Sequence, residues 1–512
     1  MKYLYGLAIL SCLVLWSSCR NDFETVASSG ELSFSKDTVY LDTIFSQIGS
    51  STYNLKVYNR SNKDISIPNV GLALGEASHY RLNVDGVPGK VFQDVQILAK
   101  DSIFIFIETT LDINNLPGNA NDFLYTDQIL FDSGANQQKV ELVTLVKDAV
   151  FLYPEKYPDG TFESLNLGPG PDGKDVLLKG FFLDDNELTF TNEKPYVIYG
   201  FAAVPGNKTL MVEAGARVHF HAESGILVAN DGSIRAIGEP SADPKLLEKE
   251  IIFQGDRLEP AFANIPGQWG FIWLTSGSKN NEFRHTTIKN GIVGIMLHDS
   301  PLTLSNVQIY NNTNSGLLAR TGSVYGENVV INNSGQSSLK IEFGGSYTFN
   351  HCTFANYWTD GFRNAATVSL DNSLDLGDDG VFVFDLVQAD FTNCIIYGSD
   401  RMELSLYQHT GADFNFNFKN SLLRFDDTTG QFMDNPLYDF SNPILYNNVV
   451  FNLDPVFQNT GKNNFNIEKD TSGAENIGIT PTTPPVPIDL NGTLRGNPSD
   501  AGAYESIEFP QG

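Results

Sequence analysis

Two basic residues, Lys340 and Arg363, stand 23 positions apart in a part of the chain that repeats at similar intervals. If the repeat brings them onto neighbouring turns of a coil, their backbones lie roughly 5 Å apart and both cations can reach one sugar carboxylate. Two unpaired cations this close disfavour each other's charge, which can lower the pKa of a lysine toward that of a useful base. Glu342 could instead form a salt bridge with Lys340 and remove that effect. The alternative is a solvated face whose basic residues offset the charge of an acidic protein.

Two cysteines, Cys352 and Cys394, occupy the same place in the similar stretches FNHCTF and FTNCII. The repeat puts them two turns apart, roughly 9.6 Å between Cα atoms, which is beyond the reach of a disulfide. A zinc site formed with His351 lacks the paired ligand spacing of such sites. We therefore expect two buried free thiols and no metal site.

The elements that must position these residues follow from an internal repeat. Polar residues recur at intervals of 21, 22, 23, 21, 21 and 27: His285, Asn306, Asn328, His351, Asn372, Asn393 and Asn420. Asn suits a sharp corner because it tolerates left-handed backbone angles. A second series opens short strands at Gly294, Gly316, Ser338, Gly361 and Glu403. This pattern predicts a parallel β-solenoid in which each coil buries its apolar residues against its neighbours.

In the strands of the second series, alternate residues point outward and stack from coil to coil into one stripe. Besides Lys340 and Arg363, the outward positions hold a mixture of apolar, basic and other groups: Met296, His298, Leu318, Arg320, Glu342, Ser405 and Tyr407. The ligand-binding candidates are His298, Arg320, Lys340, Arg363 and Tyr407. The catalytic candidates are Lys340, Arg363 and Glu342, although no complete catalytic set is visible.

The coiled region resembles the right-handed parallel β-helix proteins of the pectin-lyase-like type. The stretch LMVEAGARVHFHAESGILVANDGSIRAIG, followed by IIFQG and QWGFIWL, is similar to the first coils of many bacterial members. DPVFQN, NNFNI and DLNGTLRGNPSDAGAYE are similar to their closing region. The resemblance covers roughly residues 185 to 507. It implies an active site on the outward face, where Lys or Arg removes a proton beside a uronate carboxylate neutralised by Ca²⁺ or Arg. A shared fold is nevertheless poor evidence for a shared activity.

Three aspartates follow the order seen in polygalacturonases of this fold: Asp360, Asp378 and Asp379, in YWTDGF and LGDDGVF. Those enzymes also carry Gly-His-Gly and Arg-x-Lys motifs, neither of which occurs in this chain. Asp-Gly is also a strong turn signal. The three aspartates are therefore only weak hydrolase candidates.

The first residues have the pattern of a signal peptide: Lys2, an apolar run from Leu4 to Trp16, then small residues before Cys19. LWSSC resembles a bacterial lipobox, in which the cysteine becomes the lipidated first residue of the mature protein. Trp16 departs from that pattern, and an ordinary secretory signal is the alternative. No other stretch is apolar enough to span a bilayer. The resemblance therefore implies an outer-membrane lipoprotein held by its lipid alone, on the cell surface or the periplasmic face.

From about residue 30 to 150, short alternating strands such as YNLKVYN and SIFIFIETT are separated by Asn, Asp, Gly and Ser turns. This rhythm predicts a β-sandwich, loosely resembling the immunoglobulin-like modules of bacterial surface proteins. The expected fold class is all-β, with this sandwich followed by a right-handed parallel β-helix. The expected order is signal peptide, lipidated tether, sandwich, connector, β-helix and closing region, at 1–18, 19–29, 30–150, 151–184, 185–453 and 454–512.

The chain is strongly acidic, with 33 Lys and Arg against 61 Asp and Glu and a formal net charge of −28. A nucleic-acid partner is therefore not expected. An anionic polysaccharide would need a local basic patch or bridging Ca²⁺, whereas a neutral glycan would need neither. No other cofactor is expected. We expect a cell-envelope lipoprotein whose β-helix binds glycan or another surface partner. The alternative is a polysaccharide lyase or glycoside hydrolase acting on the outward face.

Overall fold

The structure is a computed structural model that describes residues 25–115, 122–170, 173–243, 245–377 and 380–510. It consists of strands, turns and a few short 3₁₀ helices: η1 (Gly75–Ala77), η2 (Ile113–Asn115), η3 (Gly134–Asn136), η4 (Pro260–Phe262), η6 (Pro436–Tyr438) and η7 (Thr460–Lys462). In these ranges no helix is long and apolar enough to cross a membrane. The chain divides into two compact units, Met1–Asp148 and Ala149–Gly512.

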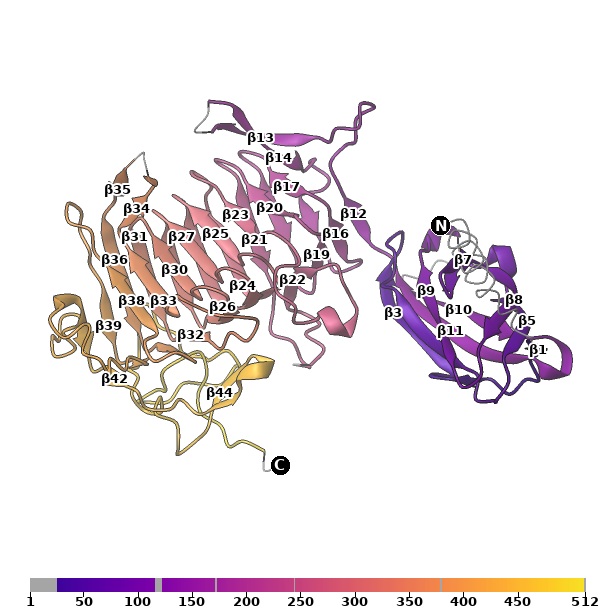
Figure 1. The fold of residues 1–512 in the computed structure, drawn as a ribbon. Coiled ribbons are helices and arrows are strands. Elements are labelled where there is room, and N and C mark those ends of the chain that lie inside the picture. Colours follow the sequence, from indigo (N-terminus) through magenta and orange to yellow (C-terminus); the bar gives the residue numbers. More distant parts are fainter. Residues whose placement is uncertain (1–24, 116–121, 171–172, 244, 378–379, 511–512) are drawn as a thin grey trace, which may run out of the picture. The chain divides into compact units, whose positions relative to one another are not determined.

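The first unit is a β-sandwich (Figure 1). One sheet has the order β1 (Val26–Ala27), β5 (Ile65–Leu72), β10 (Asp122–Phe131), β11 (Gln138–Lys147) and β3 (Thr38–Phe45), with β8 (Val91–Ile97) paired to β5. The other has the order β2 (Ser33–Phe34), β4 (Tyr53–Tyr58), β9 (Ser102–Thr109), β6 (Tyr80–Val84) and β7 (Val87–Gly89). Alternating side chains decide the packing. In β9, Ile103, Ile105 and Ile107 are buried in the core, whereas Phe104 and Phe106 point outward.

The second unit is a parallel β-helix, coloured from magenta to yellow in Figure 1. One side of its coils is a ten-stranded sheet with the order β13 (Ser164–Pro169), β14 (Asp175–Phe182), β17 (Phe201–Val204), β20 (Gly225–Val228), β23 (Ile272–Leu274), β25 (Ile295–His298), β27 (Leu317–Arg320), β30 (Leu339–Glu342), β33 (Val368–Asp371) and β38 (Leu404–Tyr407). The first two strands form an antiparallel hairpin, and the later strands pair in parallel, coil on coil.

The other sides of the coils form a sheet of 19 strands: β12 (Val150–Leu152), β15 (Thr189–Phe190), β16 (Tyr196–Ile198), β18 (Thr209–Val212), β19 (Arg217–Phe220), β21 (Ser233–Ile237), β22 (Ile251–Gly255), β24 (Asn281–Lys289), β26 (Pro301–Asn312), β28 (Ser323–Glu327), β29 (Val330–Ser334), β31 (Gly345–Asn350), β32 (Thr353–Asn356), β36 (Leu386–Thr392), β37 (Ile395–Gly398), β39 (Asn417–Lys419), β40 (Leu422–Leu423), β41 (Tyr446–Asn447) and β42 (Val450–Phe451). Two hairpins stand apart, β34 (Ser373–Asp375) with β35 (Val381–Val383) and β43 (Phe457–Asn459) with β44 (Asn464–Ile467). The fold class expected from the sequence is confirmed.

A ladder of polar residues marks one corner of the coils. Its members have left-handed backbone angles, with φ between 42° and 55°: His285, Asn306, Asn328, His351, Asn393 and Asn420. Their side chains bond along the stack, as when Asn328 Nδ2 donates to Asn306 Oδ1 at 2.9 Å. Next to the ladder, the rings of Phe349, Phe391 and Phe418 stack inside the coils. The corner is therefore fixed both by backbone conformation and by side-chain bonds.

The ladder expected from the sequence contained one error, Asn372, and the coil there is longer than the spacing suggested. Residues 350 and 392 pair directly across β31 and β36, so His351 and Asn393 lie on adjacent coils. The hairpin of β34 and β35 is an excursion within that one coil. The predicted two-turn separation of Cys352 and Cys394 was therefore wrong, because the adjoining pair Thr353 and Ile395 is one strand spacing apart. The prediction of buried free thiols is confirmed for both cysteines.

The last part of the chain, residues 454–510, here called the C-terminal segment, lies along the ladder (Figure 1). Asn328, Asn393 and Asn420 each donate a side-chain hydrogen bond of 2.8 to 2.9 Å to its backbone carbonyl groups. Small apolar clusters, including Phe465 of the segment and Tyr310 of β26, fill the space between. Ladder amides therefore form hydrogen bonds both to one another and to the C-terminal segment that covers them.

Candidate functional site on the outer face of the β-helix

The outward side of the ten-stranded sheet, here called the outer face, carries side chains that stack from coil to coil. The register places one row in the order Leu227, Trp273, Met296, Leu318, Lys340, Ser369 and Ser405. A second row, two residues further along each strand, has the order His298, Arg320, Glu342, Asp371 and Tyr407. Because neighbouring strands are about 4.8 Å apart, each row presents one side chain per coil at that spacing.

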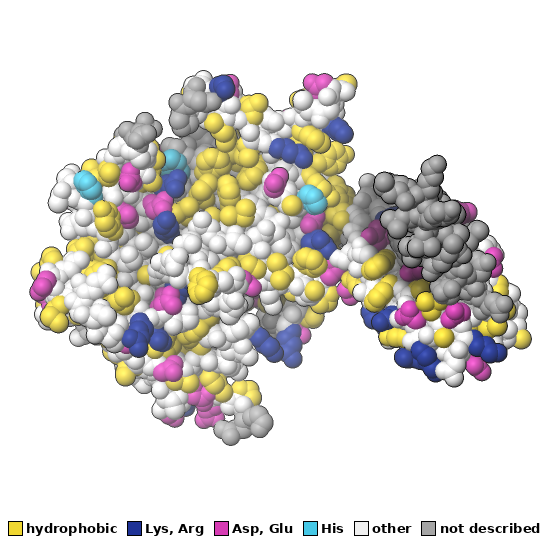
Figure 2. Space-filling view, viewed as in Figure 1, with side chains coloured by type: hydrophobic (Ala, Val, Ile, Leu, Met, Phe, Trp, Pro, Cys, Tyr) yellow, Lys and Arg dark blue, Asp and Glu magenta, His cyan; other side chains and the backbone are white. Residues whose placement is uncertain are grey.

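The first part of the outer face is apolar. Trp273 meets the edge of Phe271 at a ring-centroid distance of 6.1 Å, and Phe271 lies 5.3 Å from Phe201. Leu165 of the β13–β14 hairpin packs into the same cluster. The indole N–H of Trp273 is buried and has no hydrogen-bond partner among the described residues. Figure 2 shows hydrophobic side chains gathered below this hairpin, with charged and histidine side chains beside them.

The apolar part is followed by a cluster of three charged side chains. Glu342 accepts a hydrogen bond from Arg320 Nε at 2.9 Å and also pairs with Lys340 Nζ. Burial alone would raise the pKa of Glu342, but the two cations outweigh burial and hold the pKa below its usual value. Two cations share one carboxylate, so these three side chains carry one excess positive charge, which the nearby Asp371 carboxyl group offsets when it is ionised.

A second carboxyl group, Asp371, lies on β33, the strand next to the one that carries Glu342. Burial raises the pKa of Asp371, and the negative charge of Glu342 adds to the effect. The N–H and hydroxyl groups of Ser373 donate hydrogen bonds to Asp371 Oδ1 at 2.7 and 2.8 Å. These two bonds act in the opposite direction and lower the pKa. Carboxyl groups whose pKa values are pushed in opposite directions suit acid–base chemistry. Both carboxyl groups, however, already have partners within the protein.

The structure places Arg363 away from Lys340, and the expectation that the two lie on neighbouring outward positions was wrong. Gly361 does not open a strand; β33 begins at Val368, so the position beside Lys340 is Ser369. The side chain of Arg363 is instead only 3% exposed and forms two hydrogen bonds of 2.7 Å to Glu403, whose side chain is fully buried. The Arg363–Glu403 pair fastens the loop before β33 to the start of β38.

The remaining candidates are divided between the outer face and other places. His298 and Arg320 are paired across β25 and β27, and Tyr407 is exposed on β38. Asp360 is exposed in the loop between β32 and β33. Asp378, Asp379 and the proposed lipidation site Cys19 lie outside the described residues. The outer face thus brings together His298, Arg320, Lys340, Glu342 and Tyr407, and their roles stay predictions.

Two side chains of the outer face were missed by the sequence reasoning, Trp273 and Asp371. Trp273 stands in QWGFIWL between two buried residues, Ile272 and Leu274, and that alternation could have identified it as outward-facing. Asp371 could not be found in this way, because the misplaced strand at Gly361 hid its position.

The Ca²⁺ ion that the family resemblance implies does not fit the outer face. Ca²⁺ needs six to eight oxygen ligands, several of them carboxylates. Here Glu342 is already neutralised by two cations, and Asp371 favours its protonated form more than usual. No group of three or more His, Cys, Asp and Glu side chains suited to a metal occurs in the part of the chain that the structure describes.

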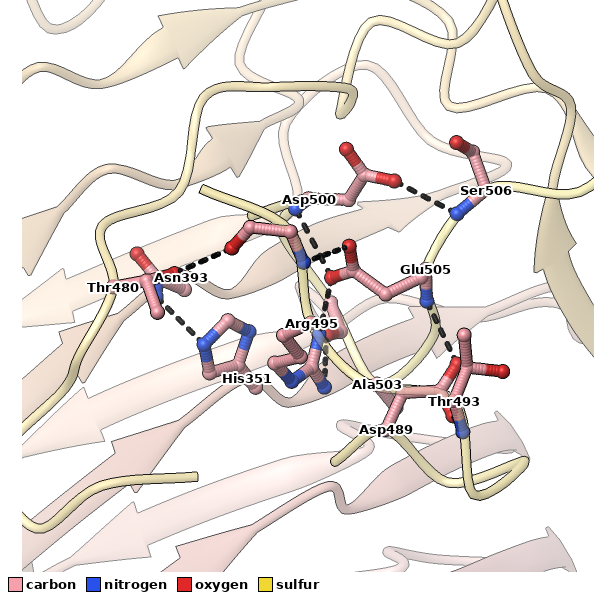
Figure 3. A network of polar contacts seen from close by, with 12 residues as sticks. His351, Asn393, Thr480, Asp489, Thr493, Arg495, Asp500, Ala503, Glu505 and Ser506 are labelled. Carbon is pink, nitrogen blue, oxygen red and sulfur yellow. Dashed lines mark hydrogen bonds and ion pairs between the residues drawn. The ribbon is translucent and has the colours of Figure 1, made fainter. Parts of the chain in front are cut away.

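A second polar cluster is buried where the C-terminal segment meets the ladder (Figure 3). Arg495 is fully buried and donates to Glu505 at 3.0 Å and to Asn328 at 2.7 Å. Asn393 donates to His351 Nε2 at 2.8 Å. Since these groups are shielded from solvent, the cluster holds the segment in place and is not a ligand site.

His351 makes the β-helix sensitive to acid. Burial, reinforced by the charge of Arg495, lowers the pKa of His351 to about 2. In the unfolded chain this histidine takes up a proton near pH 6.5, whereas in the folded chain it stays neutral. Its effect on the free energy of unfolding is therefore absent above about pH 6.5. As the pH drops from there toward 2, the free energy of unfolding falls by about 1.4 kcal/mol per pH unit. Replacing His351 with Asn, the residue at other ladder positions, should reduce the loss of stability between pH 7 and pH 5 by about 2 kcal/mol.

Thermal unfolding of parent and His351→Asn at the two pH values measures this difference. The exposed His298, replaced by Asn, is the control and should leave the acid sensitivity unchanged. An equal loss of stability in parent and His351→Asn would contradict the assignment.

No family model and no curated protein matches the chain. A family 123 glycoside hydrolase from Clostridium perfringens is 8% identical, with a TM-score of 0.17, over 24% of this chain and 30% of that one. The periplasmic chaperone SfaE is 11% identical, with a TM-score of 0.16, over 29% of this chain and 82% of that one.

A GH87 alpha-1,3-glucanase from Streptomyces thermodiastaticus strain HF3-3 is 10% identical, with a TM-score of 0.14. That similarity covers 72% of this chain and 78% of the glucanase chain. At TM-scores of this size, neither the fold nor the activity of this chain follows from these similarities.

Proposed function

We propose that this protein is a lipid-anchored cell-envelope protein of a Gram-negative bacterium whose β-helix binds a polysaccharide on the outer face. One observation carries the proposal. The apolar row of Trp273, Met296 and Leu318 leads, one coil at a time, into the cluster of Arg320, Lys340 and Glu342. An aromatic and apolar surface can cover the faces of sugar rings, and charged groups beside it can bind hydroxyl or carboxylate groups.

The geometry suits a long ligand better than a small one. The rows follow the axis of the solenoid with one side chain per strand spacing of about 4.8 Å, which is close to the length of one sugar unit in an extended chain. An elongated ligand could therefore make an equivalent contact on each coil. The guanidinium of Arg320 and the ammonium of Lys340 can bind the carboxylate of an acidic sugar at that end of the row.

Glycoside hydrolysis on the same face is the second candidate, favoured by the opposite pKa shifts of Glu342 and Asp371. Binding is preferred because Glu342 is held by two cations, so a catalytic role would require breaking an ion pair first. Lys340 likewise pairs with Glu342 and does not have Arg363 beside it, which weakens the case for a lyase base.

The proposal is tested by measuring the affinity of the protein for a panel of polysaccharides, together with the release of reducing or unsaturated ends. Trp273→Ala should weaken binding by about 2 kcal/mol, as for a central aromatic contact. Arg320→Ala and Lys340→Ala should each cost about 1 to 3 kcal/mol for an acidic glycan. The parent should release no product.

Arg235 offers a matched control on the other sheet, because it is also paired with a carboxylate, Glu282, at 2.8 Å. Arg235→Ala should bind as the parent does. If the parent released product and Asp371→Ala did not, hydrolysis and not binding alone would be the function of the outer face. Unchanged affinity in all three outer-face variants would contradict the site.

The lipid anchor is tested separately through Cys19. The apolar run ending in LWSSC motivates the expectation that Cys19→Ala moves the protein from the membrane fraction to the soluble fraction. Immunoblotting of the two fractions measures the distribution. A variant that stays in the membrane fraction would rule out an anchor at this residue.

A further inference from the structure

The outward side of the five-stranded sheet in the first unit carries an aromatic strip that no core covers. Phe104 and Phe106 lie two residues apart on β9, each 43% exposed. Their rings are stacked, with centroids 6.1 Å apart and an angle of 16° between the planes. Tyr58, on the neighbouring strand β4, extends the strip. Half-exposed phenylalanines in the middle of a sheet forgo burial that a core position would give them, which calls for an explanation.

Two cations lie against these rings. Lys56 Nζ is 5.1 Å from the centroid of Phe104 and 5.4 Å from that of Tyr58, and the guanidinium of Arg60 is 4.1 Å from Tyr58. Neither Lys56 nor Arg60 forms an ion pair with any residue that the structure describes. In a chain with a net charge of −28, two adjacent cations that pair with none of the described carboxylates form a local positive site.

Polar side chains border the rings on both sides. Across the strands, Phe106 is paired with Asn54 on β4 and with Asn83 on β6. Asn54 is exposed, whereas the side-chain oxygen of Asn83 is buried and has no hydrogen-bond partner in the described ranges. Further along, Arg81 faces Glu108 at 3.7 Å. The strip therefore combines flat apolar rings with hydrogen-bonding groups of both kinds.

We propose that this strip is a second carbohydrate-binding site, and that it takes an acidic oligosaccharide. The apolar faces of two successive sugar rings would lie on Phe104 and Phe106, a carboxylate would meet Lys56 and Arg60, and a hydroxyl group would bond to the exposed Asn54. The site is separate from the outer face of the β-helix and does not depend on the function proposed there.

A membrane surface, the other partner that aromatic and basic groups attract, fits less well. The rings lie in the middle of the sheet, on β9, and not at a loop tip. Inserting them into a bilayer would also take Asn54, Asn83 and the Arg81–Glu108 pair out of water, which is costly for groups without full partners.

The test is titration of the full chain with oligogalacturonides and with uncharged malto-oligosaccharides of the same length. Phe104→Ala combined with Phe106→Ala should weaken oligogalacturonide binding about tenfold or more, whereas Phe106→Trp should retain it. Lys56→Ala combined with Arg60→Ala should remove the preference for the charged sugar. Tyr40 is a still more exposed aromatic residue on the other sheet, so Tyr40→Ala is the control and should bind as the parent does.

Each titration is repeated with Trp273→Ala as the starting protein, so that loss at the strip and loss at the outer face are measured separately. Equal affinity of the Phe104 and Phe106 double variant and its parent would overturn the proposal. So would binding of the parent to phosphatidylglycerol vesicles but to no oligosaccharide. Sedimentation that shows a dimer for the parent and a monomer for the double variant would assign the strip to a second copy of the chain and would equally overturn it.

Discussion

Glu403→Ala is expected to destabilise the β-helix by about 3 to 5 kcal/mol, because the buried guanidinium of Arg363 loses its buried counter-charge and keeps only the half-exposed Asp400. Glu403 accepts two hydrogen bonds from Arg363 and one each from the N–H and hydroxyl groups of Thr367. All of these lie where β33 and β38 begin. Since a solenoid opens locally, the loss should be measured by amide hydrogen exchange of these two strands together with thermal unfolding.

Two variants distinguish the buried ion pair from the exposed charge beside it and from a simple loss of side-chain volume. Asp400 also approaches Arg363, at 3.0 Å, but is half exposed, so Asp400→Ala should cost less than about 1 kcal/mol. Arg363→Met combined with Glu403→Leu removes both charges and should be more stable than Glu403→Ala. If Glu403→Ala were as stable as the parent, Arg363 would have to be accessible to water, and its exclusion from the ligand site would be wrong.

Arg495→Ala should release the C-terminal segment from the ladder. Arg495 is fully buried and joins three places: Glu505 and Gly502 of the segment, and Asn328 of the ladder. Its removal leaves the Glu505 carboxyl group, whose pKa burial already raises, without its cation. We expect a loss of about 3 to 5 kcal/mol, seen as faster amide exchange in residues 464–505 and as new sites of limited proteolysis there.

The exposed Lys469 of the same segment is the matched control, and Lys469→Ala should leave exchange unchanged. Exchange in the strands at the start of the β-helix, such as β19 and β21, should stay unchanged in both variants, because each coil contacts only its neighbours. Loss of protection through the whole β-helix in Arg495→Ala would show that the segment stabilises more than the ladder it covers.

The sequence allowed the ladder to be predicted because its physical requirement is local. A sharp corner with left-handed angles admits few residue types, and Asn recurring at intervals close to one coil length points to such a corner on each coil. His285 and His351 could be placed in the series because the apolar residues around them keep the same order, with Phe283 and Phe349 two positions earlier.

The error at Asn372 arose because one long coil has the length of two short ones. The interval from His351 to Asn393 is 42 residues, twice 21, and Asn372 stands at its midpoint. Spacing alone cannot tell an excursion from an extra coil. The pairing of β31 directly with β36 decides it, and that pairing depends on contacts between segments distant in sequence.

The same limit applies to the candidate site. Lys340, Arg320 and Glu342 could be predicted to share a face because they lie in coils of regular length. Arg363 was misplaced because TDGF has the composition of a coil corner, whereas the strand begins at Val368. The ion pair of Glu342 with Lys340 could be anticipated from its position, but the second pair with Arg320 and the choice between free and paired cations require the side-chain geometry.

The excursion formed by β34 and β35 affects how such a chain can diverge. It lengthens one coil, yet β33 and β38 pair without a register shift, and β31 and β36 pair with a single shift at Gly345. Because the entropic cost of a longer connection grows only slowly with its length, insertions at the place of the β34–β35 hairpin are tolerated. Mutation can therefore change what surrounds the outer face while the spacing along its rows stays constant. Descendants of one ancestral solenoid would be expected to differ most in loop length here and least in the residues of the ladder.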